Sequence, residues 1–258
     1  MNIVQQTYQK PATSDSKEAV IIISKLVKKF AQHTVLNEFS LTLQKEESLV
    51  VLGRSGSGKS VLIKCIIGLM KPDAGDIEVL GENILSLNKE ELDKLRTRVG
   101  FLFQSNALYD SMTIRENLEF SVRRHREDIS DEELEKRVME VLTNVGLPHT
   151  VDMMPNELSG GMQKRIALAR TLILNPEIIL YDEPTSGLDP VTGKEISTLI
   201  VEVQKKYRTS SIIISHDIAC VKRVADRIAV LADGKCYATG TYEMLERSDD
   251  TKIKQFFE

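Results

Sequence analysis

Residues 53–60 carry the pattern that most constrains this chain. They read Gly-Arg-Ser-Gly-Ser-Gly-Lys-Ser, which matches the phosphate-binding loop G-x-x-x-x-G-K-[ST]. The apolar run 48–52 precedes the loop, and a segment with helical character, 61–68, follows it. A strand that feeds a glycine-rich turn into a helix N-terminus aims backbone N–H groups at one point, where the helix dipole adds positive charge. We therefore expect the chain to bind a nucleotide through its phosphates.

The positions of this loop have separate expected roles. Glycines allow the backbone to approach a phosphate closely. Lys59 is expected to point into a solvent-accessible site and reach the terminal phosphates, and Ser60 to ligate Mg²⁺. The predicted nucleotide-binding residues of this segment are Gly53, Arg54, Ser55, Gly56, Ser57, Gly58, Lys59, Ser60 and Val61.

The charge balance and cysteine content exclude several other classes. The 258 residues include 34 Lys and Arg against 38 Asp and Glu, for a net charge of −4. A general nucleic-acid binder would be basic, so no nucleic-acid partner is expected. The three cysteines show no C-x-x-C spacing, which disfavours a disulfide scaffold or a zinc site and favours a reducing compartment.

No apolar run reaches the roughly 20 residues that a membrane-spanning helix needs. Residues 1–18 are polar and lack the apolar core of a secretory signal, so we predict a flexible tail there.

Hydrophobic patterning predicts an α/β fold. Short β-like runs at 20–23, 39–43 and 76–80 come first, and helical signals dominate between 88 and 146. From residue 155 onward, continuous apolar runs alternate with helices, which is typical of parallel strands buried on both faces. These runs are 178–181, 212–214 and 228–231, and residues 232–235 resemble a hairpin turn.

Three capping boxes are predicted at helix starts. Ser130 with Glu133 precedes apolar residues at helical spacing, and Gly146 is expected to end that helix. Thr113 with Glu116 is a second box, and the residue pair at 88 and 91 is a weaker one.

A second element of phosphate chemistry lies far downstream. The apolar strand 178–181 leads into Asp182 and Glu183. Asp182 can hold Mg²⁺ beside a nucleotide, and Glu183 can orient and polarise the attacking water. An apolar run that ends in two acids is common by itself, and a solvated strand end is the alternative; the phosphate loop makes the catalytic interpretation the stronger one.

The run Leu-Ser-Gly-Gly-Met-Gln at 158–163, placed before a predicted helix, identifies a family resemblance. It is similar to the LSGGQ signature of ABC transporter ATP-binding subunits, with Met162 in the place of glutamine. Two glycines and a serine at a helix N-terminus form a second anion site, and in the family this site completes the nucleotide site of a partner subunit. The resemblance assigns nucleotide-binding roles to Ser159, Gly160, Gly161 and Met162. An ordinary capped helix start is disfavoured, because the other elements of the family are present in order.

Four further residues match the family pattern, and the resemblance covers about residues 20–245. Phe30 matches the aromatic residue that stacks on adenine, usually Tyr, although a core position is the alternative. Gln104, at the end of the predicted strand 99–103, matches the Q-loop glutamine that contacts Mg²⁺ and water. Asp189 belongs to a D-loop-like run, and His216 matches the switch histidine that contacts the γ-phosphate. The implied catalytic residues are Glu183, His216 and Gln104, and the implied metal ligands are Ser60, Gln104 and Asp182, with ATP and Mg²⁺ bound.

The resemblance implies a P-loop NTPase fold with a mostly parallel core sheet, an antiparallel β subdomain and a helical subdomain at about 105–165. The expected organisation is a tail at 1–18, an ATP-binding domain at 19–245 and a short C-terminal extension at 246–258. One chain carries only half of each composite site, so a homodimer is implied, with two ATP molecules between the phosphate loop of one chain and the signature of the other. Integral membrane permease subunits would dock near 104–112, where Leu108, Tyr109 and Met112 are candidates for contact or for burial.

Two segments resemble the ATPases of MCE-type phospholipid transporters, which include the maintenance-of-lipid-asymmetry system. One is 103–118, similar to "FQ-x-x-ALF-x-x-M", and the other is 248–257, similar to "S-D-D-P-x-V-x-Q-F" with Thr251 in the place of proline. The resemblance implies an ATPase that powers phospholipid trafficking from the cytoplasmic face of the inner membrane, beside an MCE-type lipid-binding protein. A different importer, for amino acids or other small solutes, is the alternative, and a non-transport ABC ATPase is a more distant one.

Overall fold

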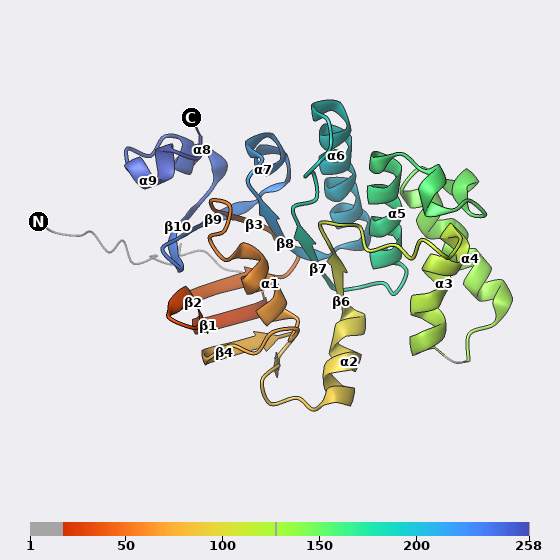
Figure 1. Cartoon of the computed structure of the whole chain (residues 1–258), viewed down its shortest axis with the longest axis horizontal. Coiled ribbons are helices and arrows are strands. Elements are labelled where there is room, and N and C mark those ends of the chain that lie inside the picture. Colours follow the sequence, from red (N-terminus) through yellow and green to blue (C-terminus); the bar gives the residue numbers. More distant parts are fainter. Residues whose placement is uncertain (1–17, 127, 258) are drawn as a thin grey trace, which may run out of the picture.

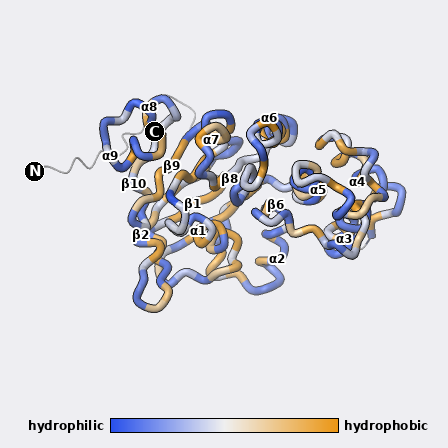
Figure 2. The backbone as a smooth tube through the Cα atoms, turned by 45° about the horizontal axis from the view of Figure 1, so that its top comes forward, coloured by the Kyte–Doolittle hydropathy of each residue, from blue (hydrophilic) through white to orange (hydrophobic). Residues whose placement is uncertain are grey.

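The computed structural model describes residues 18–126 and 128–257, so all of the predicted tail except Glu18 lies outside the described residues. Figure 1 shows a central sheet, with a smaller antiparallel sheet on one side of it and helices α3 and α4 at the opposite end of the molecule from α8 and α9. Figure 2 shows hydrophobic residues along central strands such as β9, whereas α2 is mainly hydrophilic.

The central sheet has six strands in the order β10-β9-β3-β8-β7-β6. Every pairing is parallel except that of β9 with β10, which forms the predicted hairpin. All residues of β3, β7 and β8 are buried, which confirms the interpretation of the apolar runs as strands covered on both faces. The bounds are β3 Ser48–Leu52, β6 Val99–Leu102, β7 Ile178–Asp182, β8 Ser210–Ser215, β9 Arg227–Ala232 and β10 Lys235–Gly240.

Strand β3 divides the hydrophobic core between the two faces of this sheet. Val50 and Leu52 pack with residues of the helices α3 to α7, whereas Leu49 and Val51 pack with α1 and the antiparallel sheet. Successive side chains of a strand point to opposite faces, so one five-residue strand stabilises both layers. The helices around the sheet are α1 Lys59–Ile66, α5 Gly160–Leu172, α6 Pro190–Tyr207 and α7 Ile218–Val224.

The antiparallel sheet has the order β2-β1-β4-β5 and contains the predicted β-like runs. The pairing of β1 with β2 contains several register shifts, and it places Phe30 opposite His33 beside the β1–β2 turn. The bounds are β1 Ala19–Phe30, β2 His33–Gln44, β4 Ala74–Val79 and β5 Glu82–Asn83.

The helices between β5 and α5 begin at the predicted residues. They are α2 Lys89–Arg98, α3 Ile114–His125 and α4 Asp131–Asn144, followed by short 3₁₀ turns at Pro148–Thr150 and Pro155–Glu157. The boxes of α2 and α3 are complete, since side chain and backbone bond in both directions. The box predicted at Ser130 is only half formed: Ser130 accepts from the Glu133 N–H, while the Glu133 carboxylate bonds Arg137 instead. Gly146 has φ of +75° and follows the end of α4, as predicted.

The C-terminal segment contains α8 Tyr242–Glu246 and α9 Thr251–Lys254, next to the β9–β10 hairpin (Figure 1). The rings of Tyr242 and Phe257 pack edge to face with centroids 5.3 Å apart. Lys252 bonds Asp233 of the hairpin turn at 2.7 Å. The segment is therefore folded against the same chain through both apolar and charged contacts.

Candidate functional site

The phosphate loop joins β3 to α1, as the sequence predicts. Gly56 and Gly58 have φ of +76° and +102°, a backbone region that residues with a side chain rarely adopt. A Cβ atom on Gly58 would also lie 2.5 Å from Cγ1 of Val35 in β2. Glycine at position 58 is therefore required both by the turn and by the neighbouring strand.

Lys59, the first residue of α1, is only 6% exposed, and it lines a cavity over the phosphate loop. Its ammonium donates to the carbonyls of Gly53 and Arg54 at 2.8 and 3.1 Å. It also lies 3.6 Å from Oε1 of Glu183. The loop thus wraps around its own lysine and holds the charge beside the carboxylate.

Ser60 and Asp182 meet across the loop and the end of β7. The Ser60 hydroxyl donates to Oδ1 of Asp182 at 3.1 Å. Burial raises the pKa of Asp182, and the hydrogen bond from Ser60 opposes this shift. Hydroxyl and carboxylate oxygens are ligands that suit Mg²⁺, which typically takes one or two protein groups and completes its shell with phosphate and water. The two residues therefore fit the predicted metal site.

Glu183 and His216 follow β7 and β8, which are parallel neighbours and end at the same edge of the sheet. Glu183 Oε2 lies 2.8 Å from His216 Nδ1. Glu183 has φ of +50°, and its N–H donates to the carbonyl of Ile214 at 3.0 Å. A left-handed conformation at a residue with a side chain is unfavourable, and such strain is concentrated at functional sites. The backbone conformation therefore fixes the direction of the Glu183 side chain, which lines the cavity over the phosphate loop.

A cavity of about 340 Å³ lies over these groups. Gln104 reaches it from the segment after β6, which ends at Leu102, one residue earlier than predicted. Gln104 Nε2 donates to the hydroxyl of Ser186 at 3.2 Å. Val35 of β2 also lines the cavity and was not predicted, because a lone valine in a strand gives no chemical signal. The lining residues are Val35, Ser55, Gly56, Gly58, Lys59, Ser60, Val61, Gln104, Glu183 and His216.

The signature segment occupies a different place. Ser159 caps α5, with its hydroxyl accepting from the Met162 N–H at 3.3 Å. A Cβ on Gly161 would lie 2.6 Å from Cγ2 of Thr192, so glycine is needed for the close approach of α5 to α6. Asp189 caps α6 and accepts from two backbone N–H groups. In the described part of the chain, no residue of 159–162 lines the cavity above the phosphate loop.

Phe30 is 45% exposed at the end of β1, so the alternative of a core residue is wrong. Lys28 Nζ lies 5.4 Å from the ring centroid. An exposed aromatic face can stack on a planar ligand.

The C-terminal segment adds contacts that the sequence did not predict. Arg54 of the phosphate loop donates a side-chain hydrogen bond to Gln255. A further cavity of about 440 Å³ lies between this loop, the β9–β10 turn and the segment after α9. Gln255 belongs to the C-terminal segment 248–257, and this hydrogen bond places it against the phosphate loop.

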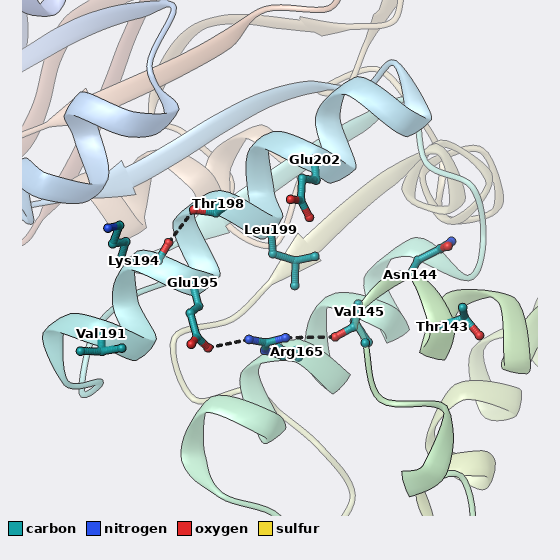
Figure 3. A pocket seen from close by; sticks show the side chains of 11 residues that line it. Thr143, Asn144, Val145, Arg165, Val191, Lys194, Glu195, Thr198, Leu199 and Glu202 are labelled. Atoms are coloured by element: carbon teal, nitrogen blue, oxygen red, sulfur yellow. Dashed lines mark hydrogen bonds and ion pairs between the residues drawn. The ribbon is translucent and has the colours of Figure 1, made fainter.

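Another cavity, of about 570 Å³, lies away from this site. It lies between the end of α4, α5 and α6 and contains none of the predicted site residues (Figure 3). In Figure 3, Arg165 bridges its two sides through Glu195 and the carbonyl of Val145. Within the ranges 18–126 and 128–257, no helix combines the length and the apolar character that crossing a membrane requires.

Comparison with known proteins agrees with this geometry. A family model described as ABC transporter matches residues 36–186. A probable ribonucleotide transport ATP-binding protein, mkl, of Mycobacterium bovis is 39% identical over 236 residues, which are 92% of this chain and 66% of the relative. The intermembrane phospholipid transport system ATP-binding protein MlaF of Haemophilus influenzae is 36% identical over 237 residues, 92% of this chain and 89% of the relative.

Other relatives serve different substrates. The methionine import ATP-binding protein MetN of Lactobacillus johnsonii is 38% identical over 227 residues, 86% of this chain and 64% of the relative. The chain thus spans about two thirds of the length of the mycobacterial relative and slightly less of MetN.

A solved dimeric ATP-binding cassette in a post-hydrolysis state, bound to ADP and Pi, superposes with a TM-score of 0.78. It is 32% identical in sequence, and the match covers 86% of this chain and 98% of that one. The extent of these matches, together with the phosphate loop and the acids at its edge, places the chain in the ABC transporter family, as an ATP-binding and ATP-hydrolysing domain of the P-loop fold.

Proposed function

We propose that this chain hydrolyses ATP as one half of a homodimer and thereby powers the transport of phospholipids through membrane permease subunits. The observation that carries the hydrolytic part is the arrangement around Glu183, whose two oxygens lie beside His216 and Lys59. The lipid substrate is supported by likeness to MlaF and by the two segments at 103–118 and 248–257.

In this proposal each group at the cavity has one task. Lys59 neutralises the terminal phosphates, while Ser60, Asp182 and Gln104 hold Mg²⁺. The metal ion, when bound, offsets negative charge on the phosphates. Glu183 orients the attacking water and accepts its proton, and His216 contacts the γ-phosphate. Phe30 stacks on the adenine from the β1–β2 end.

The dimer follows from the separation of two motifs. Residues 159–162 lie at the N-terminus of α5, a place that favours an anion, yet the described residues that line the cavity over the phosphate loop are others. We infer that this anion site closes on the nucleotide of a second copy. ATP would then be held between the two chains, and its hydrolysis would release them.

An aromatic surface next to Gln104 is the proposed docking site for the permease. Tyr109 and Phe120 are 43% and 39% exposed, and their rings pack with centroids 5.2 Å apart. Leu108, which was a candidate for the same surface, packs against the core instead. Exposed aromatic residues in contact are typical anchors of protein interfaces. This surface adjoins Gln104, which lines the nucleotide cavity. A conformational change at the nucleotide site can therefore reach a helix that is docked on the surface.

Reconstitution tests the substrate. The chain is purified together with candidate permease subunits and a candidate MCE-type protein, and bound lipid is identified by mass spectrometry. ATP-dependent transfer of a labelled phospholipid between vesicles is then measured, with the Glu183→Gln variant as the control. Transfer that requires ATP and is absent with the variant is expected. Since MetN is also a relative, methionine-stimulated hydrolysis with no lipid transfer would instead assign the chain to amino-acid import.

A further inference from the structure

Lys164 is a buried cation in the interior of α5. The residue is 2% exposed, and its ammonium donates to the main-chain carbonyl of Gln104 at 2.8 Å. No other hydrogen bond or ion pair of this ammonium occurs among the described residues. Burial lowers the pKa of Lys164, while the charge of Asp182 opposes the shift. Burying a charge costs free energy, and a single hydrogen bond to a carbonyl offsets only part of that cost. We therefore look for a role of this ammonium other than stabilising the fold.

The carbonyl that Lys164 binds belongs to a strained turn. Asn106 and Ala107 both have positive φ, +62° and +53°. Asn106 Oδ1 is buried without a hydrogen-bond partner among the described residues. Such a turn persists only where its surroundings hold it in place.

A second cation of α5 holds the other end of the same turn. Arg170 donates to the carbonyl of Ala107 at 2.6 Å and lies over the ring of Tyr109, with Cζ 5.8 Å from the centroid. Lys164 and Arg170 thus bind the main chain at both ends of 104–107. One rigid helix therefore fixes the segment between the nucleotide cavity and the aromatic surface.

The same helix begins at the signature. Ser159 is its cap, and Lys164 lies one turn further along, about 6 Å from Gly160 at the usual rise per residue. Any movement of α5 that accompanies contact between 159–162 and a partner's nucleotide must therefore reach the carbonyl of Gln104.

We propose that Lys164 is a positioning residue for ATP hydrolysis, which acts through the carbonyl of Gln104 and makes the place of that glutamine depend on α5. The inference rests on the proposed role of Gln104 at the metal and attacking water. It assigns to Lys164 no contact with the nucleotide.

Lys164→Met tests this directly. Methionine keeps the length and apolar stem of lysine but cannot donate to the carbonyl. We expect kcat to fall roughly 10- to 100-fold, as for a misplaced catalytic group, while the affinity for a fluorescent ATP analogue and the melting temperature stay near those of the unmodified chain. Lys164→Arg retains a donor and should recover part of kcat.

A double-mutant cycle separates positioning through Gln104 from a general packing effect. In the Gln104→Ala background, Lys164→Met should have little further effect, because the group it positions is gone. Arg165→Met is the matched control: the adjacent residue of α5 faces Glu195 and Val145 instead, so its effect should add to that of Gln104→Ala (Figure 3).

Three outcomes would overturn the inference, and they differ in whether the proposed role of Gln104 also fails. If Gln104→Ala lowers kcat but Lys164→Met does not, the role of Lys164 is wrong and the proposed function stands. If the two effects add fully, Lys164 does not act through Gln104. If Gln104→Ala leaves hydrolysis unchanged, both the role of Gln104 and the inference built on it fail.

Discussion

Glu183 and His216 lie at the ends of neighbouring parallel strands, with Glu183 Oε2 2.8 Å from His216 Nδ1. The other oxygen of Glu183 faces Lys59 at 3.6 Å. The carboxylate is therefore held at both oxygens, and its backbone is fixed in a left-handed conformation. A preorganised carboxylate of this kind can orient water with little rearrangement during the reaction.

Glu183→Gln should keep ATP binding and block turnover. The amide preserves the shape of the side chain but cannot accept the proton of water as a carboxylate does. We expect an ATP-trapped dimer, detected by size-exclusion chromatography with ATP and Mg²⁺ and compared with the unmodified chain. Hydrolysis at the unmodified rate would remove Glu183 from its proposed role.

Lys59→Ala should weaken nucleotide binding or abolish hydrolysis, because the terminal phosphates lose their charge partner. Since Lys59 is buried and bonds two carbonyls of its own loop, we also expect a loss of stability of about 1–3 kcal/mol. Binding of a fluorescent ATP analogue and urea unfolding measure the two effects separately. A variant that unfolds at a lower urea concentration but hydrolyses ATP at the unmodified rate would show that Lys59 only stabilises the structure of the loop.

The sequence predicted the main features of the site because its motifs are local. Residues 53–60 follow a short apolar strand, and Asp182 and Glu183 end another, so each motif carries its own structural context. The parallel order of β3, β8 and β7 then brings the strand ends together at one edge. That the edge of an open α/β sheet collects ligand-binding groups is a general property of such folds.

Contacts between distant residues could not be predicted in this way. Lys164 and Gln104 are 60 positions apart, and Arg54 and Gln255 are 201 apart. Nothing in the local pattern says that a lysine in an amphipathic helix will be buried against a carbonyl, or that a polar tail will return to the phosphate loop. The half-formed box at Ser130 has a related cause, since Arg137 competes for the carboxylate of Glu133.

Asn117→Leu tests the support of the proposed docking surface. Asn117 is fully buried in α3; its amide accepts from the N–H of Tyr109 and donates to the carbonyls of Tyr109 and Met112, at 2.8, 3.0 and 3.1 Å. Leucine has the same branched shape, although it is larger, and it leaves these backbone groups without partners. We expect a loss of roughly 2–4 kcal/mol in the free energy of unfolding, measured with urea.

Asn156→Leu is the control for that variant, because Asn156 is exposed in the 3₁₀ turn Pro155–Glu157. Its stability should stay within about 0.5 kcal/mol of the unmodified chain. If the two variants have the same free energy of unfolding, the hydrogen bonds of Asn117 to Tyr109 and Met112 do not stabilise the segment before α3.

Ser159→Arg tests whether the signature completes a site on a second chain. Ser159 caps α5, whereas the cavity over the phosphate loop is lined by residues that exclude 159–162. A bulky cation at this position should block closure of the dimer and abolish hydrolysis. The first step, in which ATP binds to the phosphate loop of a single chain, should remain intact.

Mixing the Ser159→Arg chain with the Lys59→Ala chain makes the test sharper. Each heterodimer then has one site with both defects and one site with neither, so activity should return if one working site suffices. The affinity of each separate variant for a fluorescent ATP analogue, measured by titration of the monomer, is the cleaner comparison, because it does not depend on how many sites must act. Ser159→Arg should bind nearly as tightly as the unmodified chain, and Lys59→Ala much more weakly. If Ser159→Arg abolishes binding to the monomer as thoroughly as Lys59→Ala does, the phosphate loop and the signature act on one nucleotide within a single chain, and the composite site between two chains is wrong.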